Sequence, residues 1–338
     1  MLFSPAGIET SYLALGDRLS LPTRAVGRDE AGQLSEALKD LACVVHMAGP
    51  FAFTSAPMLD ACLATKTSYI DITGEIEAFE SLWARKEEIR RAGITALPGD
   101  GFDVVPTDCL AGYVAGNVTA PVSLVLALRE LENASQSTLR TAIRQIPKPV
   151  LCRRAGAIVV LEDRSRGWID FGSGNEPCVP VSWGDVSTTF HSTGAGNVTV
   201  YFRRTRLLRW ANVPGKALGP LLRSALGQRE LAAIIRKFPE GPSQSRRSVQ
   251  RPTVWARAVR ALGDSFTASL ATPDAYDFTA NSVLEIASRI SRLPAALGLV
   301  TPFQAFGADF VLGLPGCFRT DMPAPQTGPP AHIDDPYR

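Results

Sequence analysis

The segment LACVVHMAGPFAFTSAPMLDACLATKTSYIDITGE, residues 41–75, contains two short apolar runs separated by a longer stretch with helical spacing. The first run, 41–47, is interrupted only by His46, as expected for a strand of a parallel sheet covered on both faces. The second run, 68–73, has the same character. Between them, apolar residues on one face predict a helix from about 55 to 66, capped by Ser55. The segment therefore predicts a β–α–β unit.

A third apolar run, 94–98, follows a predicted helix that begins at Glu75 and ends at Gly93. The three predicted strands are centred near Val44, Ile70 and Ala96, so each centre lies 26 residues after the last. That spacing is typical of a repeated β–α unit. We expect an α/β fold with a doubly wound parallel sheet.

Beyond Pro106 the pattern changes, and it predicts a second, mixed α/β domain. A helix is expected over about 107–116, a strand over 122–131, and antiparallel strands through the glycine-rich stretch 150–205. A hairpin over 254–271 and an amphipathic helix over 274–291 follow. Further helices are expected over 135–145 and 215–236.

The composition excludes several classes of protein. The chain has 338 residues, of which 45% are hydrophobic and 20% charged, with a net charge of +2. These values indicate a two-domain globular protein and argue against a dedicated nucleic-acid binder. The uncharged run 293–308 is too short for a membrane span. Six scattered cysteines suggest reduced thiols in a cytoplasmic protein, and three histidines give no support for a metal site.

The expected ligand edge lies beyond the carboxyl ends of the three strands. Glycines there allow the backbone to approach a ligand closely, although each one alone is explained by a tight turn. Three glycine-bearing segments at one edge favour a binding site. The predicted cofactor-binding residues are Ala48, Gly49, Pro50, Phe51, Gly99, Gly101 and Phe102.

The predicted catalytic residues at this edge are Asp103 and Tyr69. A carboxylate between apolar neighbours must be paired, protonated or functional, which favours Asp103. Tyr69 and Asp71 are equally well explained as ordinary strand-end residues, and Glu75 as an N-terminal carboxylate of its own helix. His46 is interpreted as a core histidine.

Residues 41–75 and ITALPGDGFDVVPTDCLAG, 94–112, resemble the saccharopine dehydrogenase-like oxidoreductases. More narrowly, they look like the branch that contains trans-acting enoyl reductases of lipid and polyketide synthesis. FGADFVLGLPG, 306–316, is also similar. The resemblance covers most of residues 1–320 and is strongest in 41–112.

The resemblance implies an incomplete Rossmann-type parallel-sheet domain plus a second mixed α/β domain. We expect a truncated dinucleotide-binding domain over 1–118 and a substrate domain over 119–304. Residues 305–320 should return to the first domain, and 321–338 should form a loose tail. The nicotinamide ribose would lie beside residues 49–51, and residues 101–103 would border the pocket between the domains.

One departure from the family pattern bears on the cofactor. The family begins with a strand and a Gly-x-Gly-x-x-Gly turn that holds the pyrophosphate on a helix N-terminus. No such motif occurs in this sequence, which matches only from the end of the family's second strand. We expect either about 30 residues missing upstream, the favoured alternative, or a decayed paralogue. The chain as given should then bind NAD(P) weakly, and the strand at 41–47 should have an open edge.

The sequence thus suggests an NAD(P)-dependent oxidoreductase of lipid metabolism, acting on a small-molecule or lipid-like substrate. The alternatives are a non-catalytic paralogue that serves as a binding or assembly partner and, less favoured, an amino-acid dehydrogenase of the saccharopine type. Peripheral membrane contact and a homo-oligomer are compatible with the pattern. The choice between NAD and NADP is open.

Overall fold

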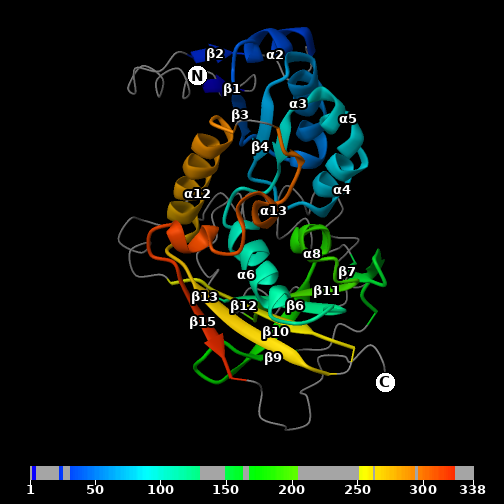
Figure 1. The fold of residues 1–338 in the computed structure, drawn as a ribbon, viewed down its shortest axis with the longest axis vertical. Helices are drawn as coiled ribbons and strands as arrows, with labels where there is room; N and C mark the ends of the chain where they lie inside the picture. Colours follow the sequence, from blue (N-terminus) through cyan, green and yellow to red (C-terminus); the bar gives the residue numbers. More distant parts are fainter. Residues whose placement is uncertain are drawn as a thin grey trace, which may run out of the picture. The chain divides into compact units, whose positions relative to one another are not determined.

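The computed structural model describes residues 2–4, 23–25, 31–129, 149–162, 167–204, 251–261, 263–293 and 296–323. The chain divides into two compact units (Figure 1). The first combines Met1–Val105 with Thr279–Ala305, and the second combines Pro106–Phe278 with Phe306–Arg338. The helices expected over 135–145 and 215–236 lie outside the described residues.

The first unit contains a four-stranded parallel sheet in the order β14-β5-β4-β3. Its strands are β3 (Cys43–His46), β4 (Ser68–Asp71), β5 (Thr95–Leu97) and β14 (Gly298–Leu299). All neighbours run parallel, which confirms the α/β fold class predicted from the 26-residue spacing. Strands β1 (Leu2–Ser4) and β2 (Thr23–Ala25) pair in a separate parallel sheet. Among the described residues, β3 pairs with β4 alone.

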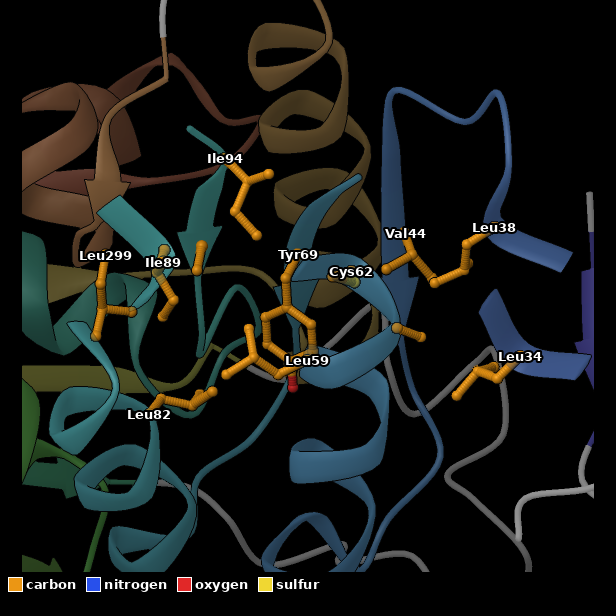
Figure 2. Packing of buried hydrophobic residues seen from close by; sticks show 12 residues of the cluster. Leu34, Leu38, Val44, Leu59, Cys62, Tyr69, Leu82, Ile89, Ile94 and Leu299 are labelled. Atoms are coloured by element: carbon orange, nitrogen blue, oxygen red, sulfur yellow. The ribbon is translucent and has the colours of Figure 1, made fainter. Parts of the chain in front are cut away.

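The helices that follow β2, β3 and β4 belong to this unit: α2 (Ala31–Leu38), α3 (Phe51–Thr65), α4 (Ile76–Ala84) and α5 (Lys86–Ala92). Figure 2 shows how they meet the sheet: the ring of Tyr69 on β4 lies among Leu59 and Cys62 of α3 and Leu82 of α4. All four side chains are almost fully buried. Apolar burial of this kind is the main stabilising contribution to the unit.

Helix α3 begins at Phe51, four residues before the predicted cap Ser55. The prediction was wrong because another part of the chain caps this helix. The Glu75 carboxylate accepts hydrogen bonds from the main-chain N–H groups of Phe51 and Ala52. The helix predicted from Glu75 to Gly93 is divided into α4 and α5 at Arg85, and Gly93 ends it in the left-handed conformation as predicted.

The second unit contains a mixed sheet in the order β15-β13-β12-β6-β11-β10-β9, with β7 and β8 joined to it through β11. Most pairs are antiparallel, but β6 and β11 run parallel. The strands are β6 (Ser123–Arg129), β7 (Leu151–Arg154), β8 (Ala157–Val160), β9 (Gly167–Asp170), β10 (Asn175–Val181), β11 (Asn197–Arg203), β12 (Thr253–Val259), β13 (Ser265–Ala271) and β15 (Phe318–Met322). The helices are α6 (Val105–Gly116), α8 (Asp185–Thr193), α13 (Pro302–Phe306, mostly in the first unit) and α12 (Ala275–Ile290, which passes from the second unit into the first).

Two expectations for this region are corrected. The stretch 150–205 is not all strand, because residues 185–193 form α8. The segment that returns to the first unit is Thr279–Ala305, through the pairing of β14 with β5, and not 305–320. Strand β15 instead pairs antiparallel with β13 over five residues, so it belongs to the mixed sheet. Two of its residues, Asp321 and Met322, had been assigned to the loose tail. The first unit's opening segment ends at Val105 rather than at 118.

None of the helices among the described residues is long and apolar enough to cross a membrane.

Candidate functional site

The carboxyl end of β4 is fixed by Asp71, whose side chain is completely buried. Its carboxylate accepts hydrogen bonds from the Tyr69 hydroxyl at 2.5 Å and from the N–H groups of Thr73 and Gly99, each at 2.9 Å. Its main-chain oxygen accepts a further bond from the N–H of Asp100 at 2.7 Å. Burial raises the pKa of Asp71 to about 6, and the three donors oppose that rise. Asp71 therefore ties the loop after β4 to the loop after β5.

Glu75 makes the equivalent link to the loop after β3. Its two carboxylate oxygens accept from Phe51 N at 3.0 Å and from Ala52 N at 2.9 Å. A carboxylate at a helix N-terminus is stabilised by the unpaired N–H groups and by the helix dipole. Glu75 thus caps α3 and makes no side-chain cap on α4, which corrects the interpretation that it serves its own helix.

Tyr69, one of the two predicted catalytic residues, is fully buried. Because its hydroxyl hydrogen bonds to Asp71, we assign His46 Nδ1, 3.2 Å away, as donor to the Tyr69 oxygen. Burial lowers the pKa of His46 to about 4, so the ring is neutral at physiological pH. Burial also raises the pKa of Tyr69 well above its usual value. These contacts give Tyr69 a positioning role toward Asp71, and its catalytic role stays a prediction.

Asp103, the other predicted catalytic residue, lies half-buried in the turn before α6. Burial raises its pKa to about 6. Its carboxylate packs on Gly74, where an added Cβ would come within 3.0 Å of Oδ2. The structure thus brings Asp103 against the loop after β4, and its role in catalysis remains a prediction.

The segment Ala48–Phe51 follows β3 directly and leads into α3. The Ala48 carbonyl accepts from the Thr54 hydroxyl at 2.7 Å, and Pro50 occupies the N-cap position after a cis Gly49–Pro50 bond. The half-buried ring of Phe51 meets the His46 ring edge-on at 5.2 Å. These residues lie at the predicted ligand edge. Their contacts are all within the chain, so their role in binding a cofactor stays a prediction.

Gly99 and Gly101, in the turn after β5, are closely packed by the chain itself. Gly99 has φ +84°, and a Cβ there would lie 2.9 Å from Phe79 Cζ. A Cβ on Gly101 would lie 3.3 Å from Thr279, whose hydroxyl accepts from the Phe102 N–H at 3.0 Å. Packing alone accounts for both glycines, so their part in cofactor binding stays a prediction.

Asp100 was not singled out from the sequence as a candidate. Its side chain is completely buried, and neither carboxylate oxygen has a hydrogen-bond partner. Burial and the negative charge of Asp71 raise its pKa well above the usual value, so ionisation of this carboxyl group is disfavoured. The available signal was a carboxylate between two glycines directly after an apolar strand.

Two of the N–H groups that open α3, those of Phe51 and Ala52, are already hydrogen-bonded to the Glu75 carboxylate. No group of three or more metal-ligating side chains occurs among the described residues.

Residues 12–97 match the family model for the saccharopine dehydrogenase NADP binding domain. This part of the chain resembles an NADP-binding domain. The matched residues include β3, β4 and β5 and end before the loop that follows β5, and they support the predicted resemblance at its coarser level. The match gives no support for the narrower assignment to the enoyl reductase branch.

The curated relatives are similar over a short region. A saccharopine dehydrogenase-like oxidoreductase from Bos taurus is 30% identical over 93 residues, 27% of this chain and 22% of the relative. A carboxynorspermidine synthase from Vibrio cholerae is 28% identical over 106 residues, 28% of this chain and 25% of the relative. The alignments thus span a quarter or less of the length of these relatives.

A solved structure is similar over most of the chain. The apo saccharopine dehydrogenase (L-Glu forming) from Saccharomyces cerevisiae aligns with a TM-score of 0.59 over 95% of this chain and 94% of its own, at 14% identity. At that identity the likeness shows the fold alone. The shared fold is a Rossmann-like α/β fold.

Proposed function

We propose that this chain is an NAD(P)-dependent oxidoreductase of the saccharopine dehydrogenase-like type. The observation that carries the proposal is the match of residues 12–97 to an NADP-binding domain. The strand ends support it, because Asp71 and Glu75 fix three loops at the edge where open α/β sheets bind ligands. Ala48–Phe51 and Gly99–Phe102 are the proposed contacts for the nucleotide.

We expect the nucleotide to bind weakly. The sequence contains no Gly-x-Gly-x-x-Gly motif. In the described part of the chain, the α3 amides that could serve a phosphate are bound to Glu75. Without backbone donors a pyrophosphate loses the principal interactions that hold it.

The proposed substrate is an α,β-unsaturated acyl thioester of lipid or polyketide synthesis, which makes the protein an enoyl reductase. This finer proposal rests on the resemblance of 41–112 and 306–316 to that branch. Asp103 is the proposed group that orients the substrate or holds a proton, because its raised pKa of about 6 suits proton exchange near neutral pH. We also propose a cytoplasmic location and, as partners, only the small-molecule substrate and a second copy of the chain.

The test is a fluorescence titration of the purified chain with NADPH and NADH, followed by two separate assays: NADPH oxidation with a crotonyl thioester, and NADP+ reduction with saccharopine. Weak saturable binding and turnover of the thioester are expected, and Asp103→Asn should lower kcat with little change in nucleotide affinity. Glu36→Gln, a change of an exposed carboxylate on α2, is the matched control. Turnover of saccharopine alone would contradict the enoyl reductase proposal.

A second candidate function is a non-catalytic paralogue that acts as a binding or assembly partner. The occupation of the α3 amides by Glu75 favours it. It predicts no saturable binding of either nucleotide, so the same titration separates the two functions.

A further inference from the structure

Two contacts join the loop after β5 to helix α12. The Phe102 N–H donates to the Thr279 hydroxyl at 3.0 Å. A Cβ added at Gly101 would lie 3.3 Å from the Thr279 side chain, so the backbone of the loop lies directly against the helix. The N–H of Asp100 donates to the Asp71 carbonyl at 2.7 Å. The loop is therefore attached both to α12 and to the end of β4, and all of these residues belong to the first unit.

The carboxyl group of Asp100 is enclosed in this loop without a hydrogen bond. Its side chain is completely buried, and neither oxygen has a hydrogen-bond partner in the described part of the chain. Three N–H groups of the loop donate elsewhere: those of Gly99 and Asp100 to Asp71, and that of Phe102 to Thr279. A buried carboxylate needs donors far more than a neutral carboxyl group does. The attached loop therefore favours the protonated form of Asp100.

The side of α12 that contacts the loop carries a second buried polar group. Ser282 lies three residues, about one helical turn, after Thr279, so the two side chains are neighbours on the helix surface. Ser282 is completely buried, and its hydroxyl has no hydrogen-bond partner among the described residues. Buried polar groups without partners weaken the packing around them. This part of α12 is therefore attached less firmly than an apolar contact of the same size.

The titratable neighbours of Asp100 increase the cost of its ionisation. Burial raises the pKa of Asp100 most, and the negative charge of Asp71 on β4 raises it further. The pKa of Cys43 on β3 is raised by burial first and then by the charge of Asp100. Asp103 follows three residues later, and burial raises its pKa to about 6. On α12 the contact to the loop comes from Thr279, which does not titrate.

We propose that protonation of Asp100 controls the attachment of the loop after β5 to α12. While the carboxyl group is neutral, the hydrogen bond from Phe102 to Thr279 is kept. When the group ionises, the loop leaves the helix and the carboxylate reaches water, where it is solvated.

The sign of the pH dependence follows from the two forms of the loop. In the open loop Asp100 has the pKa of an exposed aspartate, about 4, whereas in the attached loop its pKa is raised. Between these two values the open form has lost a proton that the attached form keeps. A rise in pH therefore favours the open form until the pKa of the attached form is reached.

The opening needs neither nucleotide nor substrate, so it is independent of the proposed oxidoreductase activity. One consequence does rest on the proposed function: because Gly99–Phe102 are proposed nucleotide contacts, opening of the loop would weaken nucleotide binding as the pH rises. The experiment is done without nucleotide, so a failure of the proposed opening and a failure of nucleotide binding are distinguishable.

The experiment follows hydrogen exchange of the Phe102 amide by NMR in the full chain between about pH 5 and pH 8, corrected for the intrinsic effect of pH on exchange. Local opening predicts a lower protection factor than for the Leu59 amide in the core helix α3. Relative to Asp100→Asn, the wild-type protection factor of Phe102 should fall by up to about tenfold per pH unit. Asp71 and Asp103 are present in both proteins, so the comparison isolates Asp100.

Two further variants keep the test decisive. Asp277→Asn removes an exposed carboxylate from α12 and should keep the wild-type pH dependence, which makes it the matched control. Ser282→Ala removes the other buried polar group, so it should keep that dependence and should not lower the protection factor. A lower protection factor in Ser282→Ala would show that the hydroxyl stabilises the contact, against the proposal. The proposal is also overturned if Asp100→Asn keeps the wild-type pH dependence, or if Phe102 and Leu59 have equal protection factors at every pH.

Discussion

At the ends of β4 and β5 the Asp71 carboxylate receives three hydrogen bonds from the chain itself, whereas on the mixed sheet Arg257 has one neutral partner, Ser265. Both groups are removed from water, so both incur a desolvation cost. In the first unit that cost is offset internally, and the carboxylate positions loops. In the second unit, less of that cost is offset, because the Arg257 guanidinium has one neutral partner and its Nε has none.

Removing Asp71 should produce the largest change. In Asp71→Ala, the Tyr69 hydroxyl and the N–H groups of Thr73 and Gly99 lose their acceptor. Each unsatisfied buried donor costs about 1–3 kcal/mol, so we expect the free energy of unfolding to fall by about 3–5 kcal/mol.

Urea denaturation measures this loss. Glu36→Ala, at an exposed carboxylate, should change the free energy of unfolding by less than about 0.5 kcal/mol. A similarly small effect of Asp71→Ala would show that the hydrogen bonds to the Asp71 carboxylate do not stabilise the strand ends. Asp71 and Arg257 would then no longer differ in this respect.

Filling the turn after β5 should have the next largest effect. In Gly99→Ala the new Cβ would lie 2.9 Å from Phe79 Cζ, at a backbone φ of +84°. Left-handed strain of about 1 kcal/mol and overpacking of about 1–3 kcal/mol predict a loss of about 2–3 kcal/mol in thermal or urea unfolding.

Gly93→Ala is the matched control. Gly93 also has a positive φ, +70°, but a Cβ there meets nothing within 4 Å, so only the strain of about 1 kcal/mol is expected. Equal losses of stability in the two variants would mean that a Cβ at Gly99 finds free space. Packing would then not explain this glycine, and the cofactor-binding role predicted from the sequence would be the better explanation.

Asp100→Asn tests a fully buried carboxylate of the first unit whose two oxygens have no hydrogen-bond partner. The folded-state pKa of Asp100 is raised, chiefly by burial and then by Asp71. As pH rises above the unfolded pKa of about 4, the unfolded chain loses a proton that the folded chain keeps. Wild-type stability should therefore fall relative to the Asn variant by about 1.4 kcal/mol per pH unit, until the folded pKa is reached.

Urea unfolding of both proteins between pH 4 and pH 8 checks this slope. Taking the difference between the two proteins removes the contributions of Asp71 and Asp103, whose pKa values are also raised. A flat difference would mean that Asp100 ionises freely in the folded protein, and its apparent isolation would then be wrong.

The sequence was informative where neighbours along the chain decide the structure. The apolar runs and their spacing predicted β3, β4, β5 and their parallel order, and Gly93 correctly predicted the end of α5. It failed for α8, because DVSTTFHST is rich in the β-branched residues typical of strands. Tertiary contacts to Arg153 outweigh that local preference.

The candidate site shows the same division. Asp71, Tyr69 and Asp103 could be chosen from the sequence because polar residues at strand ends mark a ligand edge. Asp100 was missed: it stands between two glycines directly after an apolar strand, but nothing in its local sequence shows that its carboxylate is buried without a hydrogen-bond partner. The observed bounds of the first unit also differ from the predicted ones, because the pairing of β14 with β5 joins segments about 200 residues apart.

By itself, the sequence determined the order of strands and helices and the glycine-bearing strand ends, because hydrophobic periodicity and turn chemistry act over a few residues. Only the tertiary structure decided which charges are compensated. The bonds from Phe51 to Glu75 and from Gly99 to Asp71 join residues 24 and 28 positions apart, and they exist only once the parallel strands are in register. The contacts of Arg154 with Thr199 and of Arg257 with Ser265 depend likewise on the order of strands in the mixed sheet, since register sets which side chains share a face.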